Sequence, residues 1–326
     1  MTATLVGSLP GTDVREAVRM MVDLLPDLTP VPELPGRGVG ADMVGRTAAL
    51  LVGLGIDLQP AGWRLTDAPG VDHRRARSLL AQDLDVVEEE WQGHTTRIKT
   101  QVTGPWTLVA SIERPRGDRV LADHGARREV AESLAEGVAL HVADLRRRVP
   151  GAEVVVQVDE PGLTAVLEGG VRTASGFSRH RVIHAPEADA LLRLVVDAVR
   201  GVGATPVLHS CAPRVPVALV GGAGFDGYSF DLGLLDDAGI ERWAQAHDEG
   251  LAPWIGVVPS LAPDTDPSVN DLASRTSRFL DRIGAAVVPG LPVVTPTCGL
   301  AGATPAWARR AARLVGQVDS AVLDSA

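Results

Sequence analysis

The chain has 326 residues, of which 45% are hydrophobic and 22% charged, a composition typical of globular proteins that excludes extensive disorder. Its 31 basic and 41 acidic residues give a formal net charge of −10, which argues against nucleic-acid binding because phosphate contacts need a concentrated positive surface. The 2 cysteines are too few for a disulfide scaffold.

The N-terminal segment MTATLVGSLPGTD does not have the pattern of a signal peptide. It lacks a basic region, and Gly7 and Pro10 interrupt its short apolar run. The longest apolar stretch, residues 48–56, contains two glycines and is too short to cross a bilayer. We therefore expect a cytoplasmic protein with no membrane partner.

Short β-branched runs alternate with longer helical patterns along the chain, of which residues 123–148 and 188–199 are the clearest. In chain order, eight strands are predicted at residues 5–8, 56–59, 97–103, 154–159, 205–209, 227–231, 253–258 and 292–295. Repeated strand–helix units are typical of a parallel sheet, and eight of them predict a single (β/α)8 TIM barrel domain over residues 1–326.

Such a barrel needs only about 250 residues, so we expect long loops on the catalytic face, where each strand leads into its helix. The candidates are the proline-rich residues 23–38 and residues 113–125 and 168–186. The alternative fold, a doubly wound sheet that binds a dinucleotide, needs a glycine-rich fingerprint after the first strand. The segment from Gly7 to Gly11 does not supply it.

The two cysteines both follow predicted strands, and one of them has a histidine at ligand spacing. His209 and Cys211 lie in LHSCAP after the fifth strand, with both side chains on the same side of an extended backbone, and Cys298 lies in TPTCGL after the eighth. Barrel closure brings all strand ends to one mouth, where one nitrogen and two sulfur ligands suit zinc. The competing interpretations are two buried structural thiols or a disulfide, and cytosolic redox conditions disfavour the disulfide.

Carboxylates end two further strands. In QVDEPGL, Asp159 continues the inward phase of the fourth strand better than Glu160 does, and a carboxylate in the mouth can hold a substrate ammonium. The alternative role for either residue is a helix N-terminal carboxylate. Asp231 ends the sixth strand, where its alternative role is an N-cap. Ser8, in LVGSLP, marks the end of the first strand.

The order GSLP, QVTGPWTL, QVDEPGL, LHSC and TPTCGL resembles the catalytic C-terminal barrel of the cobalamin-independent methionine synthase family, over nearly the whole chain. The resemblance implies a zinc-dependent methyltransferase that activates a thiol, homocysteine or a relative, in methionine biosynthesis. It implies that His209, Cys211 and Cys298 bind the zinc and that Ser8 and Asp159 help to hold the thiol substrate.

The sequence also departs from this family. At the end of the sixth strand the family's fourth zinc ligand is a glutamate, where this chain offers the shorter Asp231. This aspartate either binds zinc directly, acts through water or leaves that position open, and the substrate thiol can displace it. Trp63 is interpreted as replacing the family's HGE glutamate after the second strand, which predicts weak homocysteine binding or a different thiol. Leu261 is nearest to the histidine that the family carries after the seventh strand.

The resemblance also bears on the methyl donor. The full family has a second, N-terminal barrel that helps to bind methyl-folate, and these 326 residues have no room for one. Short relatives are thought to take the methyl group from a methylated corrinoid, usually presented by a partner protein. The sequence therefore predicts that folate is not used directly.

Two other functions remain open from the sequence. One is a metal-free lyase resembling uroporphyrinogen decarboxylase, which needs an arginine cluster after the first strand, where this chain offers Arg15. The other is a non-catalytic barrel that binds zinc or a thiol.

Overall fold

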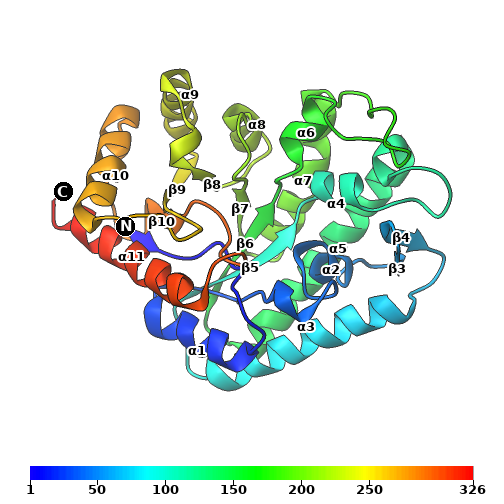
Figure 1. The fold of residues 1–326 in the computed structure, drawn as a ribbon, viewed down its shortest axis with the longest axis horizontal. Helices are drawn as coiled ribbons and strands as arrows, with labels where there is room; N and C mark the ends of the chain where they lie inside the picture. The colour runs from blue at the N-terminus through cyan, green and yellow to red at the C-terminus, as the bar shows by residue number, and fades with distance from the viewer. Residues whose placement is uncertain (326) are drawn as a thin grey trace.

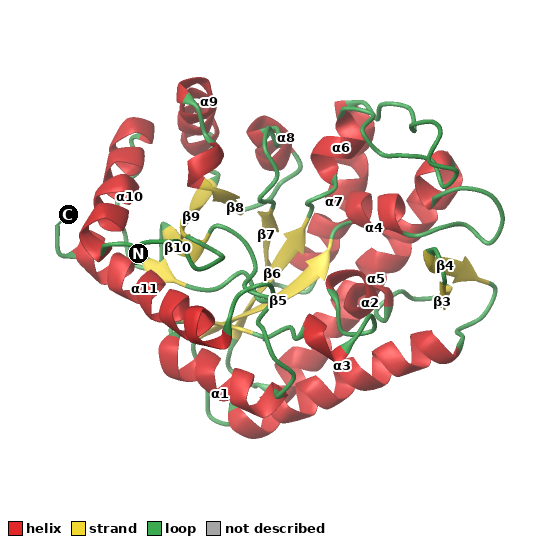
Figure 2. Ribbon diagram, viewed as in Figure 1, coloured by secondary structure: helices red, strands yellow, loops and turns green. Residues whose placement is uncertain are grey.

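The computed structural model describes residues 1–325, and within them eight parallel strands form one sheet that curls into a barrel (Figure 2). The strands follow the order β1-β10-β9-β8-β7-β6-β5-β2 around the sheet. Their bounds are β1 Thr2–Ala3, β2 Leu28–Pro30, β5 Arg97–Thr103, β6 Glu153–Asp159, β7 Thr205–His209, β8 Gly227–Asp231, β9 Ala252–Val258 and β10 Val293–Pro296. The predicted (β/α)8 barrel fold is confirmed.

The seam between β1 and β2 closes close to the carboxyl ends of the strands. Ser8 and Glu33 form a parallel bridge, in which Glu33 N donates to Gly7 O at 3.1 Å and Leu9 N donates to Glu33 O at 2.8 Å. Gly7 has a φ of 143°, and a side chain there would collide with the side chain of Gln101. Position 7 therefore requires glycine, both for its positive φ and for the space that the Gln101 side chain occupies.

Helices cover the outside of the barrel (Figure 1). Their bounds are α1 Val14–Leu24, α2 Met43–Ala48, α3 Val71–Glu90, α4 Pro105–Ser111, α5 His124–Arg148, α6 Leu163–Leu167, α7 Ala185–Gly201, α8 Val217–Gly222, α9 Asp237–Asp248, α10 Val269–Ile283 and α11 Pro305–Leu323, with short 3-10 turns at η1 Pro35–Arg37, η2 Val120–Ala122 and η3 Leu232–Leu234. Side-chain caps fix several starts: Asp123 accepts from Ala126 N, and Thr304 from Trp307 N.

The prediction that residues 56–59 form the second barrel strand is wrong. In the structure these residues belong to β3, Gly55–Gln59, which pairs antiparallel with β4, Gly62–Thr66, in a separate hairpin outside the barrel (Figure 1). The second barrel strand is β2, inside the proline-rich segment that was expected to be a loop. Three residues with a proline among them are too short to show an alternating pattern.

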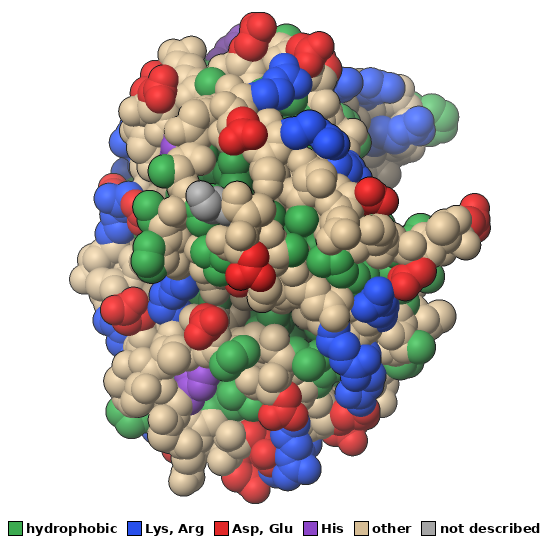
Figure 3. Space-filling model, turned by 90° about the vertical axis from the view of Figure 1, so that its left-hand side faces the viewer, with side chains coloured by type: hydrophobic (Ala, Val, Ile, Leu, Met, Phe, Trp, Pro, Cys, Tyr) green, Lys and Arg blue, Asp and Glu red, His purple; other side chains and the backbone are tan. Residues whose placement is uncertain are grey.

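The remaining strands agree closely with the sequence. The first is shifted, because its ladder covers Thr2–Ala3 and not residues 5–8. Among the described residues, no helix is long and apolar enough to cross a membrane. On the face drawn in Figure 3, basic and acidic side chains are interspersed.

Candidate metal centre and active site

Three candidate ligands meet at the mouth of the barrel. His209 ends β7, Cys211 follows two residues later, and Cys298 lies two residues past β10. A ligand atom from each of the three lies within 4.8 Å of the others. His209 is buried, while both cysteines are half-buried and free of any disulfide. The thiols are therefore neither cross-linked nor sealed in the core.

The neighbouring strand orients the histidine. His209 Nδ1 and Ser229 Oγ of β8 are 3.0 Å apart. When Nδ1 carries the ring proton and donates it to Ser229, the lone pair of Nε2 is free for a ligand. Such an outer hydrogen bond is the usual device that fixes the tautomer of a metal-binding histidine.

The two thiols polarise each other. The hydrogen bond from Cys211, together with the hydrogen bond and charge of His209, lowers the pKa of Cys298, against the opposing effect of burial. The same contact with Cys298, with burial added, raises the pKa of Cys211. The contact therefore favours the thiolate form at Cys298, and the thiolate is the form that binds metals.

Asp159 and Glu160 have different roles. Asp159 points into the barrel, where its Oδ1 accepts a hydrogen bond from Gln157 Nε2 at 2.7 Å. Burial raises the pKa of Asp159, and the charges of His209 and Lys99 act against that rise. Asp159 is thus an inward carboxylate beside the candidate metal ligands.

Glu160 caps α4. Its carboxylate accepts hydrogen bonds from Trp106 N and Thr107 N, each at 2.8 Å, and from Thr107 Oγ1 at 2.6 Å. The alternative considered for this pair, a carboxylate at a helix N-terminus, thus applies to Glu160. Its burial is compensated by these three donors, so its role is to hold the β5–α4 turn in place.

Ser8 lies beside the Cys298 loop. Leu300 N donates to Ser8 O at 2.9 Å, and a side chain at position 299 would collide with Ser8 Oγ. Gly299 therefore allows the first and last barrel strands to approach each other, which brings Ser8 next to Cys298.

The interpretation of Trp63 is wrong. Trp63 lies on β4, and its carbonyl accepts a hydrogen bond from Glu113 N at 2.9 Å, beyond the end of α4. The residue that follows the true second strand at the mouth is Glu33, which is 6% exposed and has Oε1 3.6 Å from Arg46 Nε. Burial raises its pKa, and the charges of Arg46 and Lys99 oppose the rise.

Lys99 is a second residue of the site that the sequence motifs do not single out. Its side chain is fully buried inside the barrel, where Nζ donates to Val6 O at 2.8 Å and to Gln157 Oε1 at 2.7 Å. Burial lowers its pKa, while the charges of Asp159 and Glu33 raise it. The sequence signal for Lys99 is a charged residue at an inward position of a predicted strand.

Three other predicted residues lie apart from the three-ligand group. The Asp231 side chain accepts a hydrogen bond from Gly233 N at 2.7 Å and caps η3, although it is close enough to Cys298 for that charge to raise its pKa, after burial as the main cause. Leu261 follows β9 and is 58% exposed. Arg15 pairs with Glu89 at 2.7 Å and with Glu90 on α3, so it does not serve the mouth as the lyase alternative requires.

Comparisons with known proteins agree with this fold. Residues 1–321 match the model of a family described as "Cobalamin-independent synthase, Catalytic domain". A B12-independent methionine synthase from Shewanella sp. W3-18-1, solved in complex with selenomethionine, has a TM-score of 0.65 at 13% identity, covering 99% of this chain and 98% of that chain.

Two other solved structures are less similar. A β-galactosidase from the psychrophilic Marinomonas ef1 has a TM-score of 0.49 at 15% identity, covering 100% of this chain and 60% of that chain. A methylaspartate ammonia lyase from Clostridium tetanomorphum has a TM-score of 0.47 at 12% identity, covering 99% and 59%. No curated protein matches the sequence.

Proposed function

Because the chain belongs to the family of cobalamin-independent synthase catalytic domains, we propose that it is a zinc-dependent methyltransferase that methylates the thiol of homocysteine or a close analogue. The observation that carries the proposal is the convergence of His209, Cys211 and Cys298 within 4.8 Å at the barrel mouth. From membership of this family we also propose that the protein is a cytoplasmic enzyme of methionine biosynthesis and that it consists of one barrel domain.

The donor set fits zinc. One imidazole nitrogen and two thiolates are common zinc ligands, and a catalytic zinc with three protein ligands keeps its fourth position exchangeable. Asp231, half-buried near Cys298, is proposed as a weak fourth ligand that the substrate thiol displaces. When bound, the zinc ion supplies the Lewis acidity that keeps the substrate thiol as its thiolate at neutral pH.

The chain's own residues would hold the rest of an amino-acid thiol. Asp159 and Glu33 are buried carboxylates, and the charge of Asp159 contributes to the raised pKa of Glu33. Together they offer a site for the substrate ammonium. Lys99 holds Gln157 by its Oε1, which turns Gln157 Nε2 toward Asp159. The hydroxyl of Ser8, beside the Cys298 loop, is a donor for the substrate carboxylate.

Glu33 in place of Trp63 changes the expected substrate affinity. With the glutamate present at the mouth, the reason for expecting weak homocysteine binding no longer holds. The proposal covers the thiol half of the reaction, because the residues described above recognise the thiol. The family's description as cobalamin-independent gives a methylated corrinoid donor no support.

Metal analysis is the first test. Protein purified without chelator is expected to contain one zinc per chain by mass spectrometry of the metals. Cys211→Ser and Cys298→Ser should lose it, because a serine hydroxyl stays protonated and binds zinc poorly. Asp231→Ala should lower the affinity less. Ser210→Ala is the matched control, since Ser210 lies between two ligands but its Oγ accepts a hydrogen bond from Ala212 N.

Product analysis completes the test. Zinc-loaded protein with homocysteine is expected to form methionine with a suitable donor, and methyl-folate and methylcobalamin are tried separately. If the protein contains no zinc and both cysteines react freely with a thiol reagent, the two residues are structural thiols and the proposed metal site is wrong. Zinc without methyl transfer from either donor would leave a metal-binding barrel and contradict the proposed activity.

A further inference from the structure

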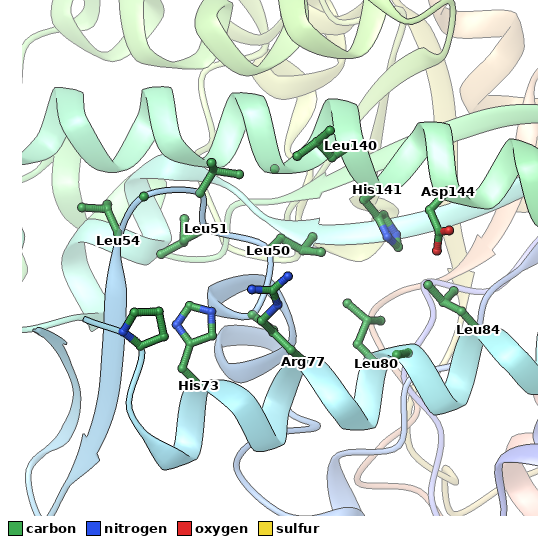
Figure 4. A pocket seen from close by; sticks show the side chains of 16 residues that line it. Leu50, Leu51, Leu54, His73, Arg77, Leu80, Leu84, Leu140, His141 and Asp144 are labelled. Atoms are coloured by element: carbon green, nitrogen blue, oxygen red, sulfur yellow. The ribbon is translucent and has the colours of Figure 1, made fainter. Parts of the chain in front are cut away.

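A cavity lies outside the barrel, between α3, α5 and the segment 49–54 (Figure 4). Its volume is about 460 Å³, which is within the range of small-molecule sites. No residue of the proposed metal or substrate site lines it. Any ligand bound there would therefore be distinct from the proposed substrate.

The cavity walls are largely aliphatic. Leu80 and Leu84 lie one turn apart on α3, and Leu140 faces them from α5 (Figure 4). Leu140 is 58% exposed, so this side of the cavity is open to solvent. The third wall is completed by leucines of the connecting segment, which are Leu50, Leu51 and Leu54.

Backbone contacts fix this third wall. A side chain at Gly137 of α5 would collide with the carbonyl of Leu50, so the segment lies directly on the helix. Ser133 Oγ also donates to Val52 O at 2.8 Å. The cavity is therefore preformed, which reduces the entropic cost of binding a ligand.

One polar side chain in the cavity lacks a partner. His73 is 1% exposed, and neither Nδ1 nor Nε2 has a hydrogen-bond partner in the described chain. Because both ring nitrogens have almost no accessible surface, His73 forms part of the closed cavity wall and is not reached by a ligand in the cavity. Burial, with the charges of Arg77 and Arg74 added, lowers the pKa of His73 and keeps it neutral.

The lining also holds an exposed arginine with no carboxylate partner in the part of the chain that the structure describes. Arg77 follows His73 by one turn on the same face of α3, and Figure 4 shows both side chains reaching toward the opposite wall. Within residues 1–325, no carboxylate lies within 4.0 Å of Arg77, whereas Asp144 is already paired with Arg147 and with Arg148 at 2.8 Å. His141 is likewise engaged, 2.9 Å from Thr100 Oγ1.

We propose that this cavity binds a medium-chain aliphatic carboxylate, with the carboxylate on Arg77 and the chain among the leucines. Arginine pairs with a carboxylate by two parallel hydrogen bonds. The aliphatic walls exclude a multiply charged anion, because they offer no partner for further charges.

Calorimetric titration of the full-length, zinc-loaded protein with sodium octanoate tests the proposal. We expect saturable binding of one octanoate per chain, about tenfold or more tighter than that of 1-octanol, which has no charge. Arg77→Gln should remove that advantage. Arg75→Gln is the matched control, because Arg75 lies on the same helix with a 75% exposed side chain and makes the same change of charge. Ala81→Trp, which fills the cavity from an exposed position, should abolish binding without changing Arg77.

Three outcomes would overturn the proposal. The first is octanoate binding no tighter than octanol binding, including no binding at all. The second is an equal affinity in Arg77→Gln and Arg75→Gln. The third is a dimer in light scattering that Leu140→Arg dissociates, because a second copy of the chain would then be the occupant of the leucine surface.

Discussion

Asp159 depends on one neighbour for its orientation. Gln157 lies two residues earlier on β6 and donates from Nε2 to Asp159, while its Oε1 accepts from Lys99. Lys99 therefore fixes the amide, and the amide fixes the carboxylate. This relay gives the fully buried lysine a structural role in the barrel, where burial opposes its charge.

Asp159→Asn is expected to weaken homocysteine binding. The substitution keeps the shape and a hydrogen-bond partner for Gln157, but it removes the charge that would face the substrate ammonium. Losing a charge-assisted hydrogen bond costs about 1.5–3 kcal/mol, so the Kd measured by calorimetry should rise roughly 10- to 100-fold. The zinc content should stay at one per chain.

The control for this variant is Asp57→Asn, on the hairpin outside the barrel, where Asp57 accepts a hydrogen bond from Gln59 Nε2 at 3.0 Å. It should leave homocysteine binding unchanged. Tight binding of homocysteine by wild-type protein that Asp159→Asn does not alter would show that the substrate is assigned wrongly.

The sequence predicted some site residues and missed others for identifiable reasons. His209 ends a five-residue strand with a clear apolar pattern and Cys211 follows two residues later, so their position at the mouth could be inferred from spacing. Glu33 follows a three-residue strand among prolines, which periodicity does not reveal. Because the sequence predicts the second barrel strand at residues 56–59 in place of β2, the position expected for the family's glutamate is assigned to Trp63.

At the scale of elements, α5 is joined to the barrel by a buried histidine. His141 Nε2 and Thr100 Oγ1 of β5 are 2.9 Å apart, and burial lowers the pKa of His141 to about 4. In the unfolded chain the pKa is about 6.5. The stability that a neutral His141 contributes is therefore complete above pH 6.5 and is lost as the pH falls from 6.5 through 4.

His141→Gln should flatten this acid dependence. Glutamine does not titrate, and its amide can still reach Thr100. The difference in unfolding free energy between wild type and variant should change by on the order of 3 kcal/mol between pH 7 and pH 4, with the wild type losing more. Urea unfolding at a series of pH values measures it.

A second histidine of α5 supplies the comparison. His124 has a 74% exposed side chain, 3.7 Å from Glu187, so His124→Gln should leave the pH dependence of stability nearly unchanged. Equal pH profiles for His141→Gln and wild type would mean that the buried histidine takes up its proton without cost, contrary to the expected effect of burial.

Long elements were predicted from the sequence better than short ones. Residues 123–148 were expected to be helical, and α5 is His124–Arg148. The β3–β4 hairpin was not foreseen, because residues 56–59 resemble a barrel strand in composition. A hairpin strand and a barrel strand differ here only in the strand they pair with, and β3 pairs with β4 instead of a parallel neighbour. Tertiary structure decides this pairing.

At the scale of the whole molecule, the barrel interior is arranged in layers. Val155, Val207 and Trp254 pack with Leu28 and Val293 in an apolar cluster. Because side chains alternate along a strand, Val155 shares the inward face of β6 with Gln157 and Asp159. The cluster thus lies beneath the polar layer of Lys99 and Gln157, and the candidate metal ligands lie above both.

This layering separates the proposed zinc from what stabilises the fold. The apolar layer, and the larger core between sheet and helices, contain none of the three ligands. Removing zinc with a chelator should therefore leave the far-ultraviolet circular dichroism at 25 °C unchanged and the thermal transition cooperative. The Tm should fall, because a ligand that binds only the native state stabilises it. The contrast is a zinc finger, in which metal binding and folding are one equilibrium.

Cys298→Ser is the matched control for chelation. It should lack zinc from the start, so the chelator should not change its Tm, and its Tm should be close to that of chelated wild type. A chelated wild-type protein that loses its circular dichroism or its cooperative transition would show that the ion supports the barrel itself. In that case the three ligands at the mouth would form a structural site, and the exchangeable fourth position on which the proposed thiol activation depends would have no place in it.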